Sequence, residues 1–206
     1  MKIRNKIIAL MISLIAIPTF VLAKDGPYFG LKATDIKVDY KTVDTINLNQ
    51  LFPTDFRAYD AHLGYNVGNG FFEFGYIKSN NESKNLGSTV YSGATISAST
   101  GMKFDGYRLG AGYNYQASKD FIIKPFINYY EIDLTASGTI TVTSGSTTVR
   151  IGNTASGKDN MIDAGLGFDY LVNDSTKVGL SYARTLDSLD DTNKVETWSI
   201  NATYSF

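Results

Sequence analysis

Apolar residues alternate with small or polar residues in several separate segments of the chain. In residues 59–67 the odd positions are apolar or aromatic, and the even positions are polar or glycine. The same alternation recurs in residues 107–115, 162–170 and 177–182. Successive side chains of a β-strand point to opposite faces, so this period of two predicts half-buried strands rather than helices.

The two faces of these predicted strands differ in an unusual way. One face is apolar and rich in tyrosine, whereas the other carries small polar groups, a few charges and many glycines. A soluble sandwich would instead have a bulky apolar inner face and a charged outer face. Glycine weakens a strand unless the space is needed, and a narrow closed barrel needs that space inside. The glycines of the small face are Gly64, Gly75, Gly110, Gly112, Gly165, Gly167 and Gly179.

Eight strands follow from the alternation. In lipid every backbone polar group must be paired within the protein, so a spanning sheet must close on itself. About 10 tilted residues cross the apolar band of an outer membrane, and all the predicted strands except the third approach or exceed that length. The predicted strands are residues 28–40, 56–67, 71–78, 102–115, 121–134, 159–171, 176–186 and 195–206.

Short and long connections alternate between these strands, as in outer-membrane barrels. We therefore predict an all-β fold: an eight-stranded, antiparallel, up-and-down transmembrane β-barrel with short turns at one end and long loops at the other. The tight turns are residues 68–70, 116–120 and 172–175, and the long segments are residues 41–55, 79–101, 135–158 and 187–194.

The first 23 residues have the organisation of a secretory signal peptide. Lys2, Arg4 and Lys6 precede an apolar stretch at residues 7–22, and Ala23 offers a small residue for cleavage. The alternatives are a transmembrane anchor or a core helix, but the apolar stretch is shorter than the roughly 20 residues that a spanning helix needs. We predict a signal peptide at residues 1–23 and the barrel domain at residues 24–206.

Composition excludes several classes of function. Removing the signal peptide takes away three basic residues and no acidic ones from a chain with 19 basic and 20 acidic residues, which leaves a surface unsuited to nucleic acid. The chain has no cysteine and one histidine, so disulfide scaffolds, thiolate chemistry and multi-histidine metal sites are excluded. Export without cysteine favours a bacterial envelope protein. We expect no cofactor and no metal.

The last predicted strand places aromatic and apolar side chains on one face. In a soluble domain this pattern would make a hydrophobic edge strand, which invites aggregation. The pattern resembles the assembly signal of bacterial outer-membrane barrels, which the barrel-assembly machinery reads in that family. The residues of this candidate signal are Trp198, Ile200, Ala202, Tyr204 and Phe206.

Taken with the signal peptide, the strand count and the loop alternation, the chain from residue 24 resembles the small outer-membrane β-barrel superfamily. That group includes the OmpA transmembrane domain, OmpX, and the opacity and attachment-invasion proteins. The resemblance implies an OmpA-like or porin-like barrel in the Gram-negative outer membrane, in contact with its lipid. It implies long loops at the cell surface, where a host or surface ligand would bind. It specifies the fold and the compartment, and it does not specify an activity.

Both signs of charge occur on the small face of the predicted strands. A narrow interior of low dielectric requires such charges to pair. The arrangement suits a salt-bridged plug that fills the lumen, and the alternatives are an ion pathway or a catalytic cluster. The predicted lumen network is Asp60, His62, Glu73, Arg108, Lys124, Asp163, Asp169 and Lys177.

Enzymatic chemistry has little support in the sequence. His62 is the one obvious base, and Asp60 lies two residues before it on the same face. Outer-membrane lipid deacylases of similar size pair a histidine with a serine two residues later, where this chain has Gly64. Asp187, Asp190 and Asp191 do not match the spacing of a calcium loop, and we interpret them as a solvated acidic loop. We predict that the protein is not an enzyme.

Two long loops, residues 89–100 and 136–157, are rich in Ser, Thr and Gly. In the second, residues 139–143 and 147–151 contain β-branched residues and flank Ser144, Gly145 and Ser146, which predicts a hairpin. The alternative is a disordered loop. We therefore predict a plugged barrel with a structural or adhesin-like role through its long loops. The alternative is a narrow porin or a conduit for small solutes, and a lipid-modifying enzyme is the least favoured function.

Overall fold

A computed structural model describes residues 25–187 and 192–206, so the predicted signal peptide lies outside the described residues. None of the helices in this part of the chain is long and apolar enough to cross a membrane. The principal strands are β1 (Gly26–Tyr40), β4 (Asp55–Val67), β5 (Gly70–Ser79), β7 (Ala94–Tyr113), β9 (Phe121–Ser144), β10 (Thr147–Leu171), β11 (Thr176–Thr185) and β12 (Thr192–Ser205). The smaller elements are β2 (Thr42–Val43), β3 (Ile46–Asn47), α2 (Leu48–Leu51), β6 (Glu82–Tyr91) and β8 (Tyr115–Gln116).

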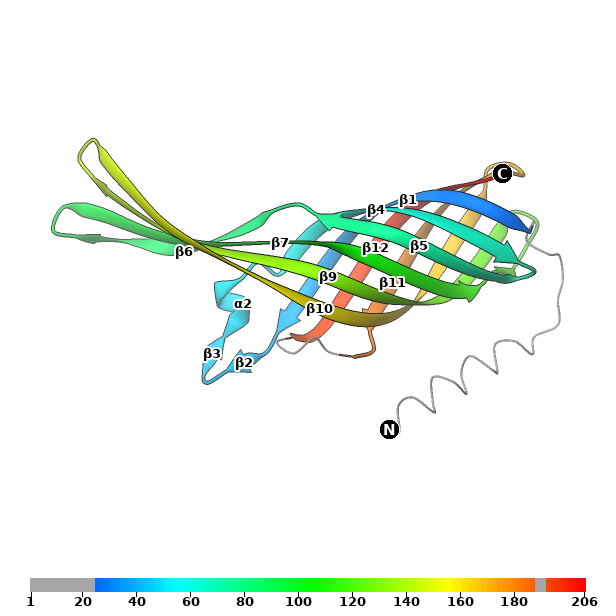
Figure 1. The fold of residues 1–206 in the computed structure, drawn as a ribbon, viewed down its shortest axis with the longest axis horizontal. Coiled ribbons are helices and arrows are strands. Elements are labelled where there is room, and N and C mark those ends of the chain that lie inside the picture. Colours follow the sequence, from blue (N-terminus) through cyan, green and yellow to red (C-terminus); the bar gives the residue numbers. More distant parts are fainter. Residues whose placement is uncertain (1–24, 188–191) are drawn as a thin grey trace.

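The eight principal strands form a closed antiparallel barrel, which confirms the predicted fold class. Each strand pairs with its neighbours in chain order, from β1 through β4, β5, β7, β9, β10 and β11 to β12. Pairing of β1 with β12 then joins the two ends of the sheet. Figure 1 shows the tilted strands wrapping around the barrel axis. Every strand of the wall therefore has a partner on both sides over the length of the barrel.

The lipid-facing side of the wall is aromatic and aliphatic, as the alternation predicts. Such a continuous apolar surface on a soluble monomer would be exceptional. Around a transmembrane barrel it forms the apolar band and the aromatic girdles. Large side chains that are exposed on this surface include Phe29, Leu31, Tyr59, Leu63, Phe72, Phe74, Tyr107, Leu109, Leu166, Phe168, Leu180, Trp198 and Ile200.

The long-loop end of the barrel differs from the prediction. Residues 79–101 were expected to be a loop, but most of them form β6 and the first part of β7. In residues 94–99 serine and threonine alternate with apolar residues, which favours a strand. Pairing between β6 and β7 satisfies the backbone groups that a loop would leave to water. Residues 41–55, also expected to be a loop, contain the β2–β3 hairpin and α2.

Strands β6, β7, β9 and β10 continue past the barrel as a four-stranded sheet. β6 pairs with β7 up to Tyr91 and Ala94, and β7 pairs with β9 from Thr95 and Thr143. β9 and β10 turn at Gly145, whose φ of 57° suits a tight hairpin turn. The predicted hairpin is thus confirmed. In Figure 1 the two hairpins project together from one end of the barrel.

The interior of the barrel has two unlike halves. Near the short turns it is polar and crowded: a Cβ atom on Gly64 would overlap the Tyr28 ring, and one on Gly179 would overlap the Asp169 carboxylate. Near the long loops the inner face is apolar, so the expectation of a small, polar inner face along every strand is wrong. The core residues there are Ile36, Phe56, Ala58, Ile77, Phe104, Tyr130, Ile132, Met161 and Val195.

Candidate functional site

All eight predicted lumen residues lie inside the barrel and are buried. They come from β4, β5, β7, β9, β10 and β11, so strands on opposite walls contribute to one cluster. Glycines on the same faces leave room for long charged side chains to cross the lumen. The buried residues are Asp60, His62, Glu73, Arg108, Lys124, Asp163, Asp169 and Lys177.

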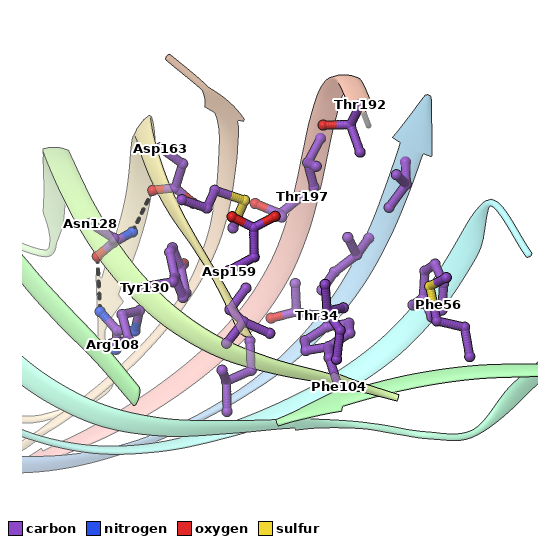
Figure 2. A pocket seen from close by; sticks show the side chains of 18 of the residues that line it. Thr34, Phe56, Phe104, Arg108, Asn128, Tyr130, Asp159, Asp163, Thr192 and Thr197 are labelled. Carbon is purple, nitrogen blue, oxygen red and sulfur yellow. Dashed lines mark hydrogen bonds between the residues drawn. The ribbon is translucent and has the colours of Figure 1, made fainter. Parts of the chain in front are cut away.

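Arg108 is the centre of this cluster. Its Nε atom lies 2.8 Å from Asp60 Oδ2, and its Nη1 atom lies 2.7 Å from Glu73 Oε2. Nη1 also donates to Asn128 Oδ1 at 3.0 Å, and Asn128 Nδ2 donates to Asp163 Oδ1 at 2.8 Å. Figure 2 shows this last relay from Arg108 through Asn128 to Asp163. The planar guanidinium, whose N–H donors have fixed directions, thus connects side chains from three other strands, β4, β5 and β9.

Glu73 and Lys124 extend the cluster toward the short-turn end. Tyr28 donates its hydroxyl proton to Glu73 Oε1 at 2.9 Å. Lys124 Nζ lies 3.7 Å from Glu73 Oε1 and 3.4 Å from Asp169 Oδ2. Asn201 donates to the other oxygen of Asp169 at 3.2 Å. Glu73 is therefore shared between two cations, Arg108 and Lys124, and the Tyr28 hydroxyl, whereas Asp169 is shared between Lys124 and Asn201.

His62 lies within the same network, and both of its ring nitrogens face carboxylates. Its Nδ1 atom is 2.7 Å from Asp60 Oδ1, and its Nε2 atom is 3.9 Å from Glu73 Oε1. The side chain is buried on the inner face of β4. Among the described residues, no group of three or more His, Cys, Asp or Glu side chains is placed to hold a metal ion.

Two of the predicted residues are connected less directly. Asp163 joins the network through Asn128. Lys177 Nζ stands 5.6 Å from the centre of the Tyr28 ring, which places its charge over an aromatic face. The structure thus brings six of the eight residues into ion pairs. Asp163 is connected through the neutral side chain of Asn128, and Lys177 contacts the neutral ring of Tyr28.

Sequence reasoning missed four residues of this site: Tyr28, Lys32, Asn128 and Asn201. Asn128 has the same parity as Lys124 along its strand, so the alternation contained a signal for it. Lys32 likewise shares the parity of Thr34 and Ile36, which point inward. For Tyr28 the sequence pattern points the wrong way, because it predicts that aromatic side chains face the lipid. Its hydroxyl instead finds a buried acceptor inside the barrel.

Space within the lumen is distributed unevenly. A gap of about 20 Å³ remains among Lys32, His62, Glu73 and Lys124, which is room for one water molecule. On the long-loop side of Arg108 a much larger cavity of about 410 Å³ is lined mainly by apolar side chains. Figure 2 shows its two ends, with Asp163, Asn128 and Arg108 at one and Phe56 at the other.

Comparison with known proteins decides the family. The family model for the outer membrane protein beta-barrel domain matches residues 7–206. The chain belongs to this family. As a member of the outer membrane protein beta-barrel family, it is a protein of the bacterial outer membrane, as predicted. Its long loops and the projecting sheet then lie at the extracellular end.

One solved structure supports the fold, and two others are similar over most of their length. Neisserial surface protein A is 14% identical, with a TM-score of 0.51, over 88% of this chain and 97% of that chain. The N-terminal barrel of Pseudomonas aeruginosa OprF is 11% identical, with a TM-score of 0.44, over 89% of this chain and 100% of that chain. Ail of Yersinia pestis is 18% identical, with a TM-score of 0.36, over 88% of this chain and 97% of that chain. A search of curated proteins found no match.

Proposed function

We propose that this outer-membrane barrel is a surface-interaction protein that binds partners along the free edge of its extracellular sheet. The observation that carries the proposal is the unpaired outer edge of β10. β10 pairs with β9 from Thr147 to Tyr170 without a register shift. It pairs with β11 only from Asp163 onward, so residues 147–162 have no strand on that side within the described part of the chain.

The backbone direction along this edge can be assigned. Ile162 accepts a hydrogen bond from Leu186 on the β11 side, so even-numbered residues of β10 direct their backbone groups away from β9. The amides of Thr154 and Asn160 agree with this assignment, because each donates to the side chain of the preceding residue. Thr148, Arg150 and Gly152 therefore present N–H and C=O groups to the surroundings.

Such an edge is chemically competent for strand addition. An extended segment of another protein gains main-chain hydrogen bonds by pairing there, and no carved pocket is required. The opposite edge of the sheet is less regular, because β6 has a register shift between Asn85 and Gly87, and bulges of this kind blunt an edge. The β10 edge is therefore the proposed binding edge.

A closed lumen is part of the same proposal. The charged cluster leaves space for about one water molecule, so we infer that the barrel does not conduct ions and is not a porin. We also infer that it is not an enzyme, since its one histidine is buried between two carboxylates. Its other partners would be outer-membrane lipid around the wall and the assembly machinery at β12.

Adhesion of cells that display the protein tests the edge. The assay compares attachment to epithelial monolayers for cells that express the wild type, Gly152→Pro, Gly152→Ala or no barrel. Proline removes the outward amide at an edge position and leaves the β9 pairing intact, so attachment should fall toward the barrel-free level. Gly152→Ala keeps the amide and should attach like the wild type. Equal attachment by the proline variant at equal surface abundance would contradict strand addition at this edge.

A further inference from the structure

We propose that the apolar cavity in the extracellular half of the lumen is a binding site for a small, uncharged and largely apolar molecule that carries one hydrogen-bond donor. This inference goes beyond the surface function proposed above and does not depend on the β10 edge. It rests on the volume, the lining and the floor of the cavity.

The walls of the cavity are apolar and come from several strands. Ile36 on β1, Phe104 on β7, Ile132 on β9 and Met161 on β10 face the space from different sides, and Phe56 lies at one end. A water-filled channel would have a polar lining. Apolar walls around an open volume favour an apolar occupant, because each wall atom lacks a contact until the volume is filled.

The volume matches a compact ligand. Pockets for small molecules measure about 300–1,000 Å³, and an engineered apolar cavity of about 150 Å³ already holds benzene. The cavity of about 410 Å³ therefore accommodates a fused two-ring aromatic compound or an aliphatic molecule of similar size. The small side chain of Ala183 contributes to the wall and gives a position at which the volume can be reduced.

The floor of the cavity determines the polarity of the ligand. Asp163 lines the cavity and is almost fully buried, and its Oδ2 atom has no hydrogen-bond partner within the described residues. Neighbouring side chains cover that oxygen, so the carboxylate would have to rotate slightly before a ligand hydroxyl or amine proton could satisfy it. Asp159, higher in the same wall, already accepts the Asn160 amide through Oδ1.

Charge and apolar walls together indicate that the ligand is neutral. The lumen side chains include four Lys or Arg residues and five Asp or Glu residues, so an added anion would have no free counter-charge. A cation would have to leave water for walls that are mainly apolar, which costs free energy. These charged groups are Lys32, Arg108, Lys124 and Lys177 against Asp60, Glu73, Asp159, Asp163 and Asp169.

The mouth of the cavity lies beside α2. Leu48 and Phe52 line it, and the Phe52 ring lies 6.1 Å from the Tyr40 ring. Asn49 holds this segment against β1, because its Oδ1 atom accepts the Tyr40 amide at 2.8 Å and its Nδ2 atom donates to Asp39 at 2.9 Å. An apolar rim at the extracellular end gives a ligand from outside a route into the cavity, and the charged cluster closes the route below.

Binding of 1-naphthol to the full barrel in lipid nanodiscs tests the site. Equilibrium dialysis measures the bound probe in excess of empty nanodiscs. We expect saturation near one molecule per barrel for the wild type. Ala183→Phe fills the cavity and should weaken binding at least about tenfold. Ala61→Phe makes the same change on the lipid-facing side and should bind like the wild type. Equal binding by all three, or no saturable binding by the wild type, would overturn the proposal.

Two further measurements keep the test decisive if Ala183→Phe does not fold. Phe104→Ala enlarges the cavity, so the affinity for 1-hydroxypyrene relative to 1-naphthol should rise about tenfold, and an unchanged ratio would contradict the site. The need for a hydrogen-bond donor on the ligand is tested with 1-methoxynaphthalene, which has no hydroxyl proton. The wild type should prefer 1-naphthol. In Asp163→Asn the side-chain oxygen should remain the acceptor for Asn128, so an NH2 group replaces Oδ2 and the preference for 1-naphthol should be lost. Equal wild-type affinity for both probes would refute the role of Asp163.

Discussion

At the scale of single residues, Arg108 is the central cation of the buried network. It is 1% exposed and connects Asp60, Glu73 and Asn128. Removing one partner of a buried ion pair leaves the other charge uncompensated, which costs far more than the net value of the pair. The barrel also contains a surface pair of the same type, Arg57 with Asp35 at 3.5 Å, in which both side chains are more than two-thirds exposed.

The two pairs provide a matched prediction. Arg108→Ala and Glu73→Ala should each lower the free energy of unfolding by about 3–5 kcal/mol. Arg57→Ala should lower it by less than about 1 kcal/mol, because an exposed pair is screened by water. Urea unfolding from lipid vesicles measures these differences. Wild-type midpoints for both buried variants would rule out the network as a stabilising element.

At the scale of elements, the β9–β10 hairpin is a rigid extension of the barrel wall. Odd-numbered residues of β10, such as Val149, direct their amides toward β9, since the even-numbered ones point outward. Lys84, which the sequence placed in a loop, lies in β6 and donates to the Asn49 carbonyl. Both long surface segments are thus held by ladder hydrogen bonds.

Proteolysis of intact cells distinguishes this hairpin from a loop. Trypsin should cut slowly after Arg150 and after Lys84, because a protease needs an extended and unpaired substrate strand. Val149→Pro removes a donor to β9 and should accelerate cleavage after Arg150 about tenfold or more. Mass spectrometry of the released fragments gives the rates. Rapid cleavage of the wild type at Arg150 would show that the hairpin, and the binding edge on it, does not persist in solution.

β12 gives a second prediction at this scale. Trp198, Ile200 and Phe206 are exposed on the lipid side, and β12 closes the barrel against β1. We expect Phe206→Asp to reduce outer-membrane abundance strongly, since the strand resembles an assembly signal. Phe121→Asp changes another exposed aromatic residue and should have the smaller effect.

Quantification of the heat-modifiable protein in outer-membrane fractions compares the two variants. Charges near the interface of a barrel cost little by themselves, about 0–1 kcal/mol, so a difference between the variants reports recognition of β12. Equal abundance of Phe206→Asp and wild type would remove the assembly role from this residue.

At the scale of the whole molecule, the apolar cavity ends on the charged cluster, in which a gap of only about 20 Å³ remains. We infer that the cluster closes the lumen at this level. We expect no discrete conductance steps in planar bilayers, because ions would have to cross a space that holds about one water molecule. The same preparation should shift on gels after boiling, which controls for folding. Reproducible ohmic steps from folded protein would establish a pore.

The sequence alone determined the wall of this protein. A period of two with one apolar face allows only strands, and glycines opposite that face require a crowded interior, so the eight strands and the charged inner positions were predictable. The hairpin at Gly145 was predictable because β-branched residues flanked a turn. These signals are local, since each depends on neighbours a few positions apart.

Tertiary structure decided what the interior does. Tyr28 meets Glu73 across 45 positions of sequence, and Arg108 meets Asp60 across 48. No local pattern specifies such contacts, because the register between strands determines which side chains share a level of the lumen. The apolar cavity arises in the same way, since inward residues of several strands surround it at one height. Alternation tells which side chains point inward, and only closure of the barrel determines which of them meet.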